Sequence, residues 1–145
     1  MNILFMCVAN SARSQLAEAI AKQAFGKKAV ICSAGSRPAT VNPFAIRAIE
    51  EVGANAGNLW SKSVDELPIE FVRDLDYVIT LCAEEVCPVM ITKAAKLHWP
   101  LPDPAGHQGS DDEQMARFRN TRELIKMKLL DFAKLAGVEL DSSSL

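Results

Sequence analysis

Short apolar runs alternate with segments of helical spacing along this chain, and the alternation limits the folds that it can adopt. The predicted strands cover 2–6, 29–34, 76–81 and 96–99, and the predicted helices cover 14–25, 43–52, 68–73 and 110–135. Strands joined through helices pair in parallel, and a parallel sheet is covered by helices on both faces. The sequence therefore predicts an α/β fold, a single-domain three-layer sandwich with a four-stranded parallel sheet.

Residues that begin or end helices stand at the boundaries of these segments. Gly26 and Gly53 follow two predicted helices, and Pro43 takes the first position of another. Ser110 and Glu113 have the spacing of a capping box at the start of the last helix. In contrast, the polar stretch before the third predicted helix shows no periodicity, and we expect it to be irregular.

Length, charge and cysteine content narrow the class of protein. The 145 residues suit one domain, which we expect to span 1–138 and to end in a frayed tail over 139–145. A formal net charge of −2 argues against general binding to nucleic acid or membrane surfaces. The run at 2–6 is too short for a signal peptide, and no later segment reaches spanning length, so we expect a soluble, cytoplasmic protein. Four cysteines there favour catalytic or redox use over structural disulfides.

The segment from Cys7 to Ser14 suits a bound anion. Cys7 follows the first predicted strand, and a tight loop leads from it into the first predicted helix. Unpaired N–H groups and the positive end of the helix dipole make such a junction an anion site, and Arg13 adds a planar guanidinium. The same field favours the thiolate form of a cysteine. The segment therefore predicts a nucleophilic sulfur aimed at a tetrahedral oxyanion.

Three chemically active side chains follow predicted strands. Cys7 comes after the first strand, Cys82 after the third, and Asp103 lies in the loop after the fourth. Active sites of parallel sheets lie beyond the carboxyl ends of the strands, so we expect these three residues to meet at one edge. Cys32 lies inside the second predicted strand and is expected to be a core residue.

Four short motifs occur in a specific order along the chain. They are Cys-x5-Arg-Ser at 7–14, Ser-Ala-Gly at 33–35, Thr-Leu-Cys-Ala-Glu-Glu-Val-Cys-Pro at 80–88 and His-Trp-Pro-Leu-Pro-Asp-Pro-Ala at 98–105. In this combination the chain resembles, over roughly residues 2–135, the arsenate reductases built on the low-molecular-weight protein tyrosine phosphatase fold. It departs from their pattern at Ala12, where many carry a second loop cysteine, and in the narrower Cys82-x4-Cys87 spacing.

The resemblance implies that the loop binds arsenate and carries the first chemical step. The thiolate of Cys7 would attack arsenic, and Asp103 would act as general acid for the departing oxygen. Ser14 would donate its hydroxyl to the Cys7 thiolate, and Asn10 would order the loop. The implied substrate-binding residues are Val8, Ala9, Asn10, Ser11, Ala12, Arg13 and Ser14.

The resemblance also implies a disulfide cascade. Cys82 would attack the Cys7 sulfur and release arsenite, and Cys87 would then attack Cys82. Thioredoxin, or another thiol donor such as glutaredoxin, would reduce the final disulfide. A helix would hold the Cα atoms of Cys82 and Cys87 roughly 8–9 Å apart, beyond the about 7 Å that a disulfide tolerates, so we expect 82–90 to unwind. The alternative is that both cysteines fill apolar space.

Some relatives of this kind bind a potassium ion near the loop. The matching positions here are Asn10, Glu18, Ser33 and Asp65, all of which offer oxygen atoms. Ordinary hydrogen bonding among these side chains is the alternative interpretation. No tightly bound cofactor is expected otherwise.

Two other functions compete with arsenate reduction. A protein tyrosine phosphatase would use Cys7, Arg13 and Asp103 in the same way, but Ala105 and Gly106 stand where those enzymes carry a tyrosine that stacks on the substrate ring. Weak phosphatase activity is expected as a by-product of the shared loop. A non-catalytic oxyanion or redox sensor is the other alternative, and it would show no turnover.

Overall fold

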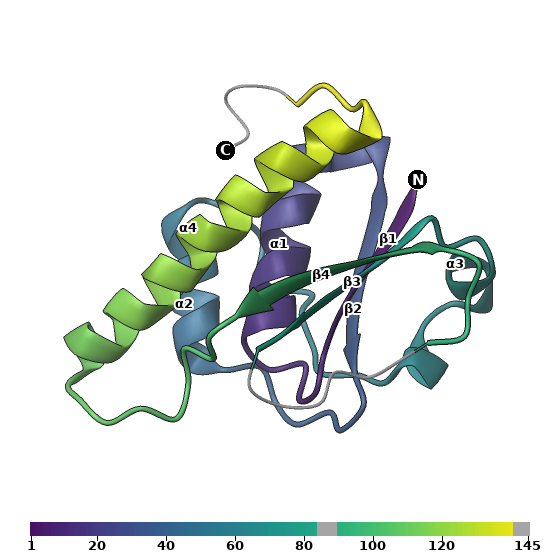
Figure 1. The fold of residues 1–145 in the computed structure, drawn as a ribbon. Coiled ribbons are helices and arrows are strands. Elements are labelled where there is room, and N and C mark those ends of the chain that lie inside the picture. The colour runs from purple at the N-terminus through teal and green to yellow at the C-terminus, as the bar shows by residue number, and fades with distance from the viewer. Residues whose placement is uncertain (84–89, 141–145) are drawn as a thin grey trace.

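A four-stranded parallel sheet forms the centre of the molecule in a computed structural model, which describes residues 1–83 and 90–140 (Figure 1). The sheet has the order β2-β1-β3-β4, and every neighbouring pair is parallel. The strands are β1 (Asn2–Cys7), β2 (Val30–Gly35), β3 (Tyr77–Cys82) and β4 (Ala95–Leu101). The four predicted strands are confirmed, with ends that differ by two residues or fewer.

The helices also lie where the hydrophobic periodicity predicts them. They are α1 (Arg13–Phe25), α2 (Pro43–Glu51), α3 (Ile69–Arg73) and α4 (Asp111–Ala136), with short 3-10 turns η1 (Gly26–Lys28) and η2 (Val64–Glu66). The predicted capping box forms at the start of α4, where the Ser110 hydroxyl accepts from the Glu113 N–H. Within residues 1–83 and 90–140, no helix is long and apolar enough to cross a lipid bilayer.

Helices cover both faces of the sheet, so the predicted three-layer α/β architecture is confirmed. α1, α2 and α4 lie together on one face, and α3 lies on the other (Figure 1). Successive residues of a strand point to opposite faces, and β1 shows this directly. Ile3 and Phe5 are buried against α1 and α4, whereas Leu4 and Met6 pack with Phe71 of α3. The middle of the sheet is therefore buried on both sides. This packing holds β1 and β3 in place, and with them the residues at their carboxyl ends.

The edge strand β4 is longer than the sequence predicts. The predicted loop over 100–109 begins two residues too early, because β4 continues through Pro100 to Leu101. β4 has a neighbour on one side only, and the β3–β4 register shifts between Thr80 and Cys82. An edge strand with such an irregularity tolerates the missing N–H of a proline. The extension brings the Leu101 carbonyl toward the site described below.

The first residues of the predicted tail pack against the domain. The Lys28 ammonium donates to the Glu139 carbonyl oxygen, and Leu140 packs against the core. Residues 139 and 140 are therefore in contact with the domain, and residues 141–145 lie outside the described residues.

Candidate active site

The segment that suits an anion forms a tight turn between β1 and α1. Cys7 is the last residue of β1 and is buried, and α1 begins at Arg13. The end of β2 lies directly against this turn, because Gly35 pairs with Cys7. A Cβ atom on Gly35 would lie 2.4 Å from the Val8 carbonyl oxygen and 2.9 Å from the Asn10 nitrogen. Only glycine leaves the turn enough space at this point.

Carbonyl groups of the turn are held from outside by the segment that follows β2. The bonds run from Arg37 N to Val8 O (2.9 Å), from Ala39 N to Ala9 O (3.0 Å) and from Asn42 N to Ser11 O (2.9 Å). A planar trans peptide directs the next N–H away from its carbonyl, so the N–H groups of residues 9, 10 and 12 point away from the segment that follows β2. Together with the first N–H groups of α1, they form a cradle for a tetrahedral oxyanion. The predicted substrate-binding residues, 8–14, all lie in this turn or the first turn of α1.

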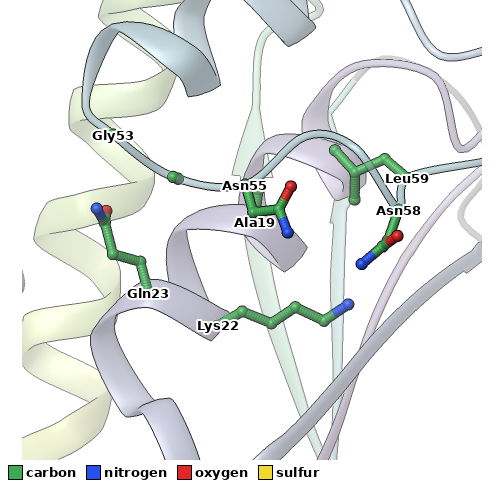
Figure 2. Close-up of a pocket in the computed structure, with 8 residues that line it drawn as sticks. Ala19, Lys22, Gln23, Gly53, Asn55, Asn58 and Leu59 are labelled. Atoms are coloured by element: carbon green, nitrogen blue, oxygen red, sulfur yellow. The ribbon is translucent and has the colours of Figure 1, made fainter.

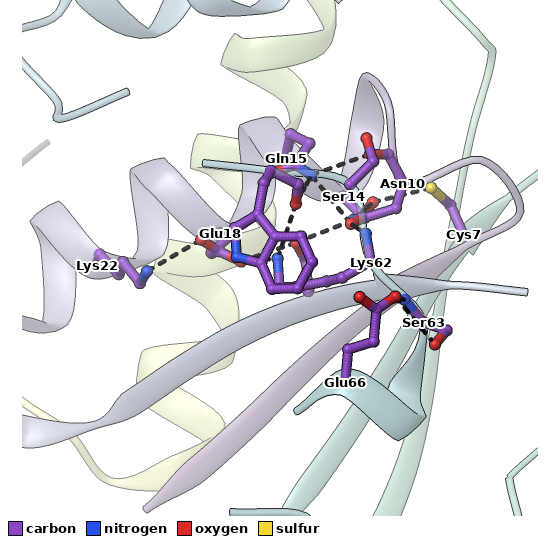
Figure 3. A network of polar contacts seen from close by, with 12 residues as sticks. Cys7, Asn10, Ser14, Gln15, Glu18, Lys22, Lys62, Ser63 and Glu66 are labelled. Carbon is purple, nitrogen blue, oxygen red and sulfur yellow. Dashed lines mark hydrogen bonds and ion pairs between the residues drawn. The ribbon is translucent and has the colours of Figure 1, made fainter. Parts of the chain in front are cut away.

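Asn10 connects the turn to three other parts of the chain (Figure 3). Its side-chain nitrogen donates to Ser14 Oγ at 2.7 Å and to Ser33 Oγ at 3.0 Å, and its side-chain oxygen accepts from the Lys62 N–H and from Gln15 Nε2, each at 3.0 Å. Asn10 is fully buried and has a φ of 49°, a conformation that asparagine tolerates better than most residues. These contacts fix the shape of the turn, the role that the family resemblance implies for Asn10.

Ser14 lies beside the sulfur of Cys7. The Cys7 Sγ–Ser14 Oγ distance is 2.8 Å, and both residues are buried. The Ser14 oxygen already accepts a hydrogen bond from Asn10, so its own proton is free to point at the sulfur. A hydroxyl that donates to sulfur stabilises the thiolate, which is the nucleophilic form.

Replacing Ser14 with alanine is expected to slow alkylation of Cys7 by iodoacetamide about tenfold at neutral pH, the effect of one hydrogen bond to a charged group. The rate is read from mass spectra of the Cys7 peptide. Ser36→Ala, at an exposed serine just past β2, serves as the control and should alkylate at the wild-type rate. An unchanged rate in Ser14→Ala would show that this hydroxyl does not support the thiolate.

Arg13 joins the turn to the carboxyl end of β4. Its guanidinium is buried and donates through Nη1 to the Leu101 carbonyl at 2.9 Å, while Nη2 lies 3.7 Å from Oδ2 of Asp103. The other carboxylate oxygen of Asp103 accepts from the Ala105 N–H at 3.0 Å, as in an Asx turn. Asp103 therefore shapes its own loop and also faces Arg13. Its side chain is 43% exposed, so it can exchange protons with solvent.

Cys82 ends β3, the strand next to β1. Met6 pairs with Thr80, so Cys7 and Cys82 occupy the carboxyl ends of neighbouring parallel strands, and both are buried. This arrangement confirms the expectation that Cys7 and Cys82 share one sheet edge. Cys87 lies outside the described residues, as do residues 84–89 of the segment 82–90 that is predicted to unwind.

Cys32 differs from these two cysteines in its surroundings. It lies within β2 and is half-buried, and burial followed by the nearby Glu18 carboxylate raises the pKa of its thiol. A raised pKa keeps the sulfur in the thiol form, as expected for a residue that packs rather than reacts.

Three of the four predicted potassium ligands lie together, and the fourth does not join them. Ser33 Oγ donates to Glu18 Oε1 at 2.8 Å and accepts from Asn10, whereas Asp65 is exposed on η2. The Lys62 ammonium lies 3.3 Å from Glu18 Oε1. Lys62 belongs to the stretch that the sequence marks as irregular. The sequence signal for it is Glu18, the one acidic residue of α1, which must find a cationic partner when buried.

Two cavities lie alongside α1. The first has about 300 Å³ and opens between α1 and residues 53–59, with Ala19, Lys22 and Gln23 on the helix side (Figure 2). The second has about 180 Å³, is lined by Glu18, Lys22 and Lys62, and therefore borders the Glu18 carboxylate. Lys22 lines both cavities. Among the described residues, no three histidine, cysteine, aspartate or glutamate side chains gather as a metal site.

Known proteins are similar to this chain over most of its length. Residues 2–142 match the family model described as low molecular weight phosphotyrosine protein phosphatase. An arsenate reductase from Halalkalibacterium halodurans is 37% identical over 134 residues, which cover 91% of this chain and 94% of that protein. An arsenate reductase from Bacillus subtilis is also 37% identical over 134 residues, with the same coverage of both chains.

Solved structures agree with these relatives. An arsenate reductase in the phosphate binding state superposes with a TM-score of 0.74 and 29% identity, over 96% of this chain and 100% of the other. A thioredoxin-dependent arsenate reductase from Corynebacterium glutamicum gives a TM-score of 0.58 and 32% identity, over 89% of this chain and 62% of the other. The phosphate-bound neighbour is an anion-binding protein of the same fold. Two curated relatives, from Halalkalibacterium halodurans and Bacillus subtilis, are arsenate reductases, and this chain belongs to the low molecular weight phosphotyrosine protein phosphatase family.

Proposed function

We propose that this chain reduces arsenate to arsenite, with Cys7 as the nucleophile and Cys82 and Cys87 as the cysteines that carry the electrons away. The observation that carries the proposal is the position of Cys7 and Cys82 at the ends of the neighbouring strands β1 and β3, beside the anion cradle. A phosphatase needs only the first of these cysteines. The names of the matched relatives support the same activity.

The first step takes place inside the turn. Arsenate has the tetrahedral shape of phosphate, so its oxygens accept from the N–H groups of the turn and from Arg13. The Cys7 thiolate attacks arsenic, an S–As bond forms, and an oxygen leaves as water after Asp103 supplies a proton. The 3.7 Å separation of Arg13 Nη2 and Asp103 Oδ2 supports this role for Asp103, because substrate bound to Arg13 would lie close to the carboxyl group.

The second step moves two electrons onto arsenic. The Cys82 thiolate attacks the Cys7 sulfur, the S–As bond breaks, and its electron pair stays on arsenic, which leaves as arsenite. Cys7 and Cys82 are then joined by a disulfide. Cys87 attacks Cys82 in turn, which releases the Cys7 thiolate and leaves a Cys82–Cys87 disulfide.

An external dithiol must reduce that last disulfide before another cycle. We propose thioredoxin as this donor, since one matched structure is a thioredoxin-dependent arsenate reductase. Thioredoxin has a reduction potential of about −270 mV, low enough to reduce disulfides that are exposed or strained.

Arsenite formation coupled to thioredoxin and its reductase tests the whole sequence. Wild type is expected to turn over, and Cys7→Ser, Cys82→Ser and Cys87→Ser are each expected to lose turnover completely. Cys32→Ser is the matched control, because Cys32 lies away from the turn on β2, and it should retain activity.

The three variants also separate the competing functions. Hydrolysis of a phosphotyrosine substrate that is lost only in Cys7→Ser, without arsenite formation by wild type, would replace the reductase with a phosphatase. Turnover of neither substrate would leave a sensor. Substituting glutaredoxin with glutathione for thioredoxin in the same assay identifies the donor.

A further inference from the structure

We infer that the ammonium group of Lys62 serves as a built-in monovalent cation for the Asn10–Ser33–Glu18 cluster, in place of a bound potassium ion, and that it positions the anion turn. The Lys62 ammonium bonds Glu18 and the Trp60 carbonyl rather than the sulfur or the N–H groups of the turn, so its role is positioning. The inference stands on the contacts of the reduced, ligand-free chain and does not depend on the redox steps proposed above.

The Lys62 ammonium is surrounded as a small cation would be. Its nitrogen lies 3.3 Å from Glu18 Oε1 and 3.1 Å from the Trp60 carbonyl oxygen, and 5.4 Å from the centre of the Trp60 ring. A carboxylate, a carbonyl and an aromatic face are the groups that stabilise a desolvated cation. Lys62 and Glu18 are exposed by only 5% and 2%, so each charge depends on the other.

The predicted potassium ligands are already engaged with donors of the chain. Asn10 Oδ1 accepts from Gln15 Nε2 and from the Lys62 N–H, and Glu18 Oε1 accepts from Ser33 Oγ and from the Lys62 ammonium. The remaining Glu18 oxygen lies 2.9 Å from the Lys22 ammonium.

Charge also disfavours an added ion. Glu18 contributes one negative charge, whereas Lys22 and Lys62 contribute two positive charges within 3.3 Å of its oxygens. A potassium ion at the same carboxylate would meet net repulsion. Asp65, the remaining predicted ligand, is exposed on η2. The residues of this chain therefore do not fit a potassium site.

A continuous chain of hydrogen bonds connects the ammonium to the nucleophile (Figure 3). It runs from Lys62 to Glu18 (3.3 Å), Ser33 (2.8 Å), Asn10 (3.0 Å), Ser14 (2.7 Å) and Cys7 (2.8 Å). The donor directions agree along this path: the Ser33 hydroxyl donates to Glu18, so its oxygen accepts from Asn10. The charge of Lys62 thus fixes the Glu18 carboxylate, and the carboxylate fixes the amide that shapes the turn.

The 180 Å³ cavity beside Glu18 makes this role testable. The cavity is lined by Lys22, Lys62 and Trp60 as well as Glu18, so shortening Lys62 would open a path from solvent to the carboxylate. A cation of suitable size can then occupy the position of the lost ammonium. Choline is too large to enter this position.

The experiment measures the melting temperature of the reduced protein in potassium, sodium and choline chloride at equal ionic strength. Wild type is expected to melt at the same temperature in potassium and sodium. Lys62→Ala is expected to melt roughly 10 °C lower in choline, since it removes the buried cation from one oxygen of the Glu18 carboxylate and leaves only the half-exposed Lys22 at the other. Potassium should restore about half of that loss and saturate with concentration, as a bound ligand does.

Two variants separate a cation from a packing role. Lys62→Met keeps the length of the side chain without its charge, so it should lose stability and show no response to potassium. Lys22→Met removes the half-exposed lysine that pairs with Glu18 but leaves Lys62 in place. Its melting temperature should therefore fall by less than that of Lys62→Ala and should not depend on the cation. The alkylation rate of Cys7 gives a second readout: it should fall in Lys62→Ala and recover with potassium.

Three results would overturn the inference. They are a saturable, potassium-specific rise in the melting temperature of wild type, a Lys62→Ala protein that responds equally to potassium and choline, and a Lys62→Met protein that responds like Lys62→Ala. If Lys62→Ala does not fold in any salt, Lys62→Ser takes its place with the same expectations, because its hydroxyl can bind the ion. Arsenate and reductant are absent throughout, so a failed arsenate reductase assay leaves these results unaffected.

Discussion

Replacing Arg13 with lysine is expected to lower kcat/KM for arsenate by about 10²–10³-fold, the usual cost of removing one preorganised donor from an oxyanion site. The guanidinium is buried and bonds the Leu101 carbonyl through one nitrogen while another faces Asp103. Lysine keeps the charge but lacks the planar fork, so it cannot hold the carbonyl, face the acid and bind two substrate oxygens together. Steady-state arsenite formation, with phosphate binding followed by calorimetry, measures the effect.

Arg37→Lys is the matched control for this change. Arg37 follows β2, and its backbone N–H holds the Val8 carbonyl, but its side chain is exposed. Its substitution should leave phosphate affinity and turnover close to wild type. If Arg13→Lys retained wild-type phosphate affinity, the oxyanion would not be bound by this guanidinium, whatever the assay for arsenate showed.

The fold and the position of the anion turn could be predicted from the sequence because both follow from local rules. Hydrophobic periodicity indicated each strand and helix, and the parallel connection brings Cys7 and Cys82 to one edge of the sheet. The Cys7–Arg13 spacing indicated an anion site from residues that are neighbours in sequence. No long-range contact was needed for these inferences.

The interior of the site could not be predicted in the same way. Gln15, Ser61 and Lys62 all bond to the turn or to Glu18, and two of them come from a stretch without periodicity. Glu18 requires a cation when it is buried, but Lys22, four residues later on the same helix, already meets that requirement when only the sequence is considered. Only the fold shows that Lys62, 44 residues away, reaches the other carboxylate oxygen.

Asp103 illustrates a different limit of sequence reasoning. The family resemblance implies a general acid at Asp103, whereas the structure shows an Asx turn together with a contact to Arg13. One carboxylate oxygen accepts from the Ala105 N–H, and the other faces the Arg13 guanidinium. The turn holds the side chain in one orientation, which is a condition for proton transfer at a fixed place.

Replacing Gly35 with alanine is expected to cost about 2–3 kcal/mol of stability, the upper range for overpacking a rigid site, and about 10²-fold in activity. The added Cβ would lie 2.4 Å from the Val8 carbonyl oxygen and 2.9 Å from the Asn10 nitrogen. Both contacts are backbone atoms of the anion turn, so no side chain can rotate to relieve them. The turn must move, and its N–H groups move with it.

Thermal unfolding and arsenite formation together show whether the loss arises at the turn. Gly57→Ala is the control, because its Cβ would meet only the side-chain oxygen of exposed Asn55, at 3.2 Å, and that oxygen can shift slightly while it still accepts from the N–H of residue 57. It should alter stability by less than about 0.5 kcal/mol, as surface substitutions do. The loss of activity in Gly35→Ala should not be explained by the loss of stability. At temperatures where the variant is fully folded its activity should stay low, because the turn is displaced in the folded protein as well. Full activity of the folded variant would mean that the cradle tolerates a displaced Val8, and that its N–H groups do not set the position of the oxyanion.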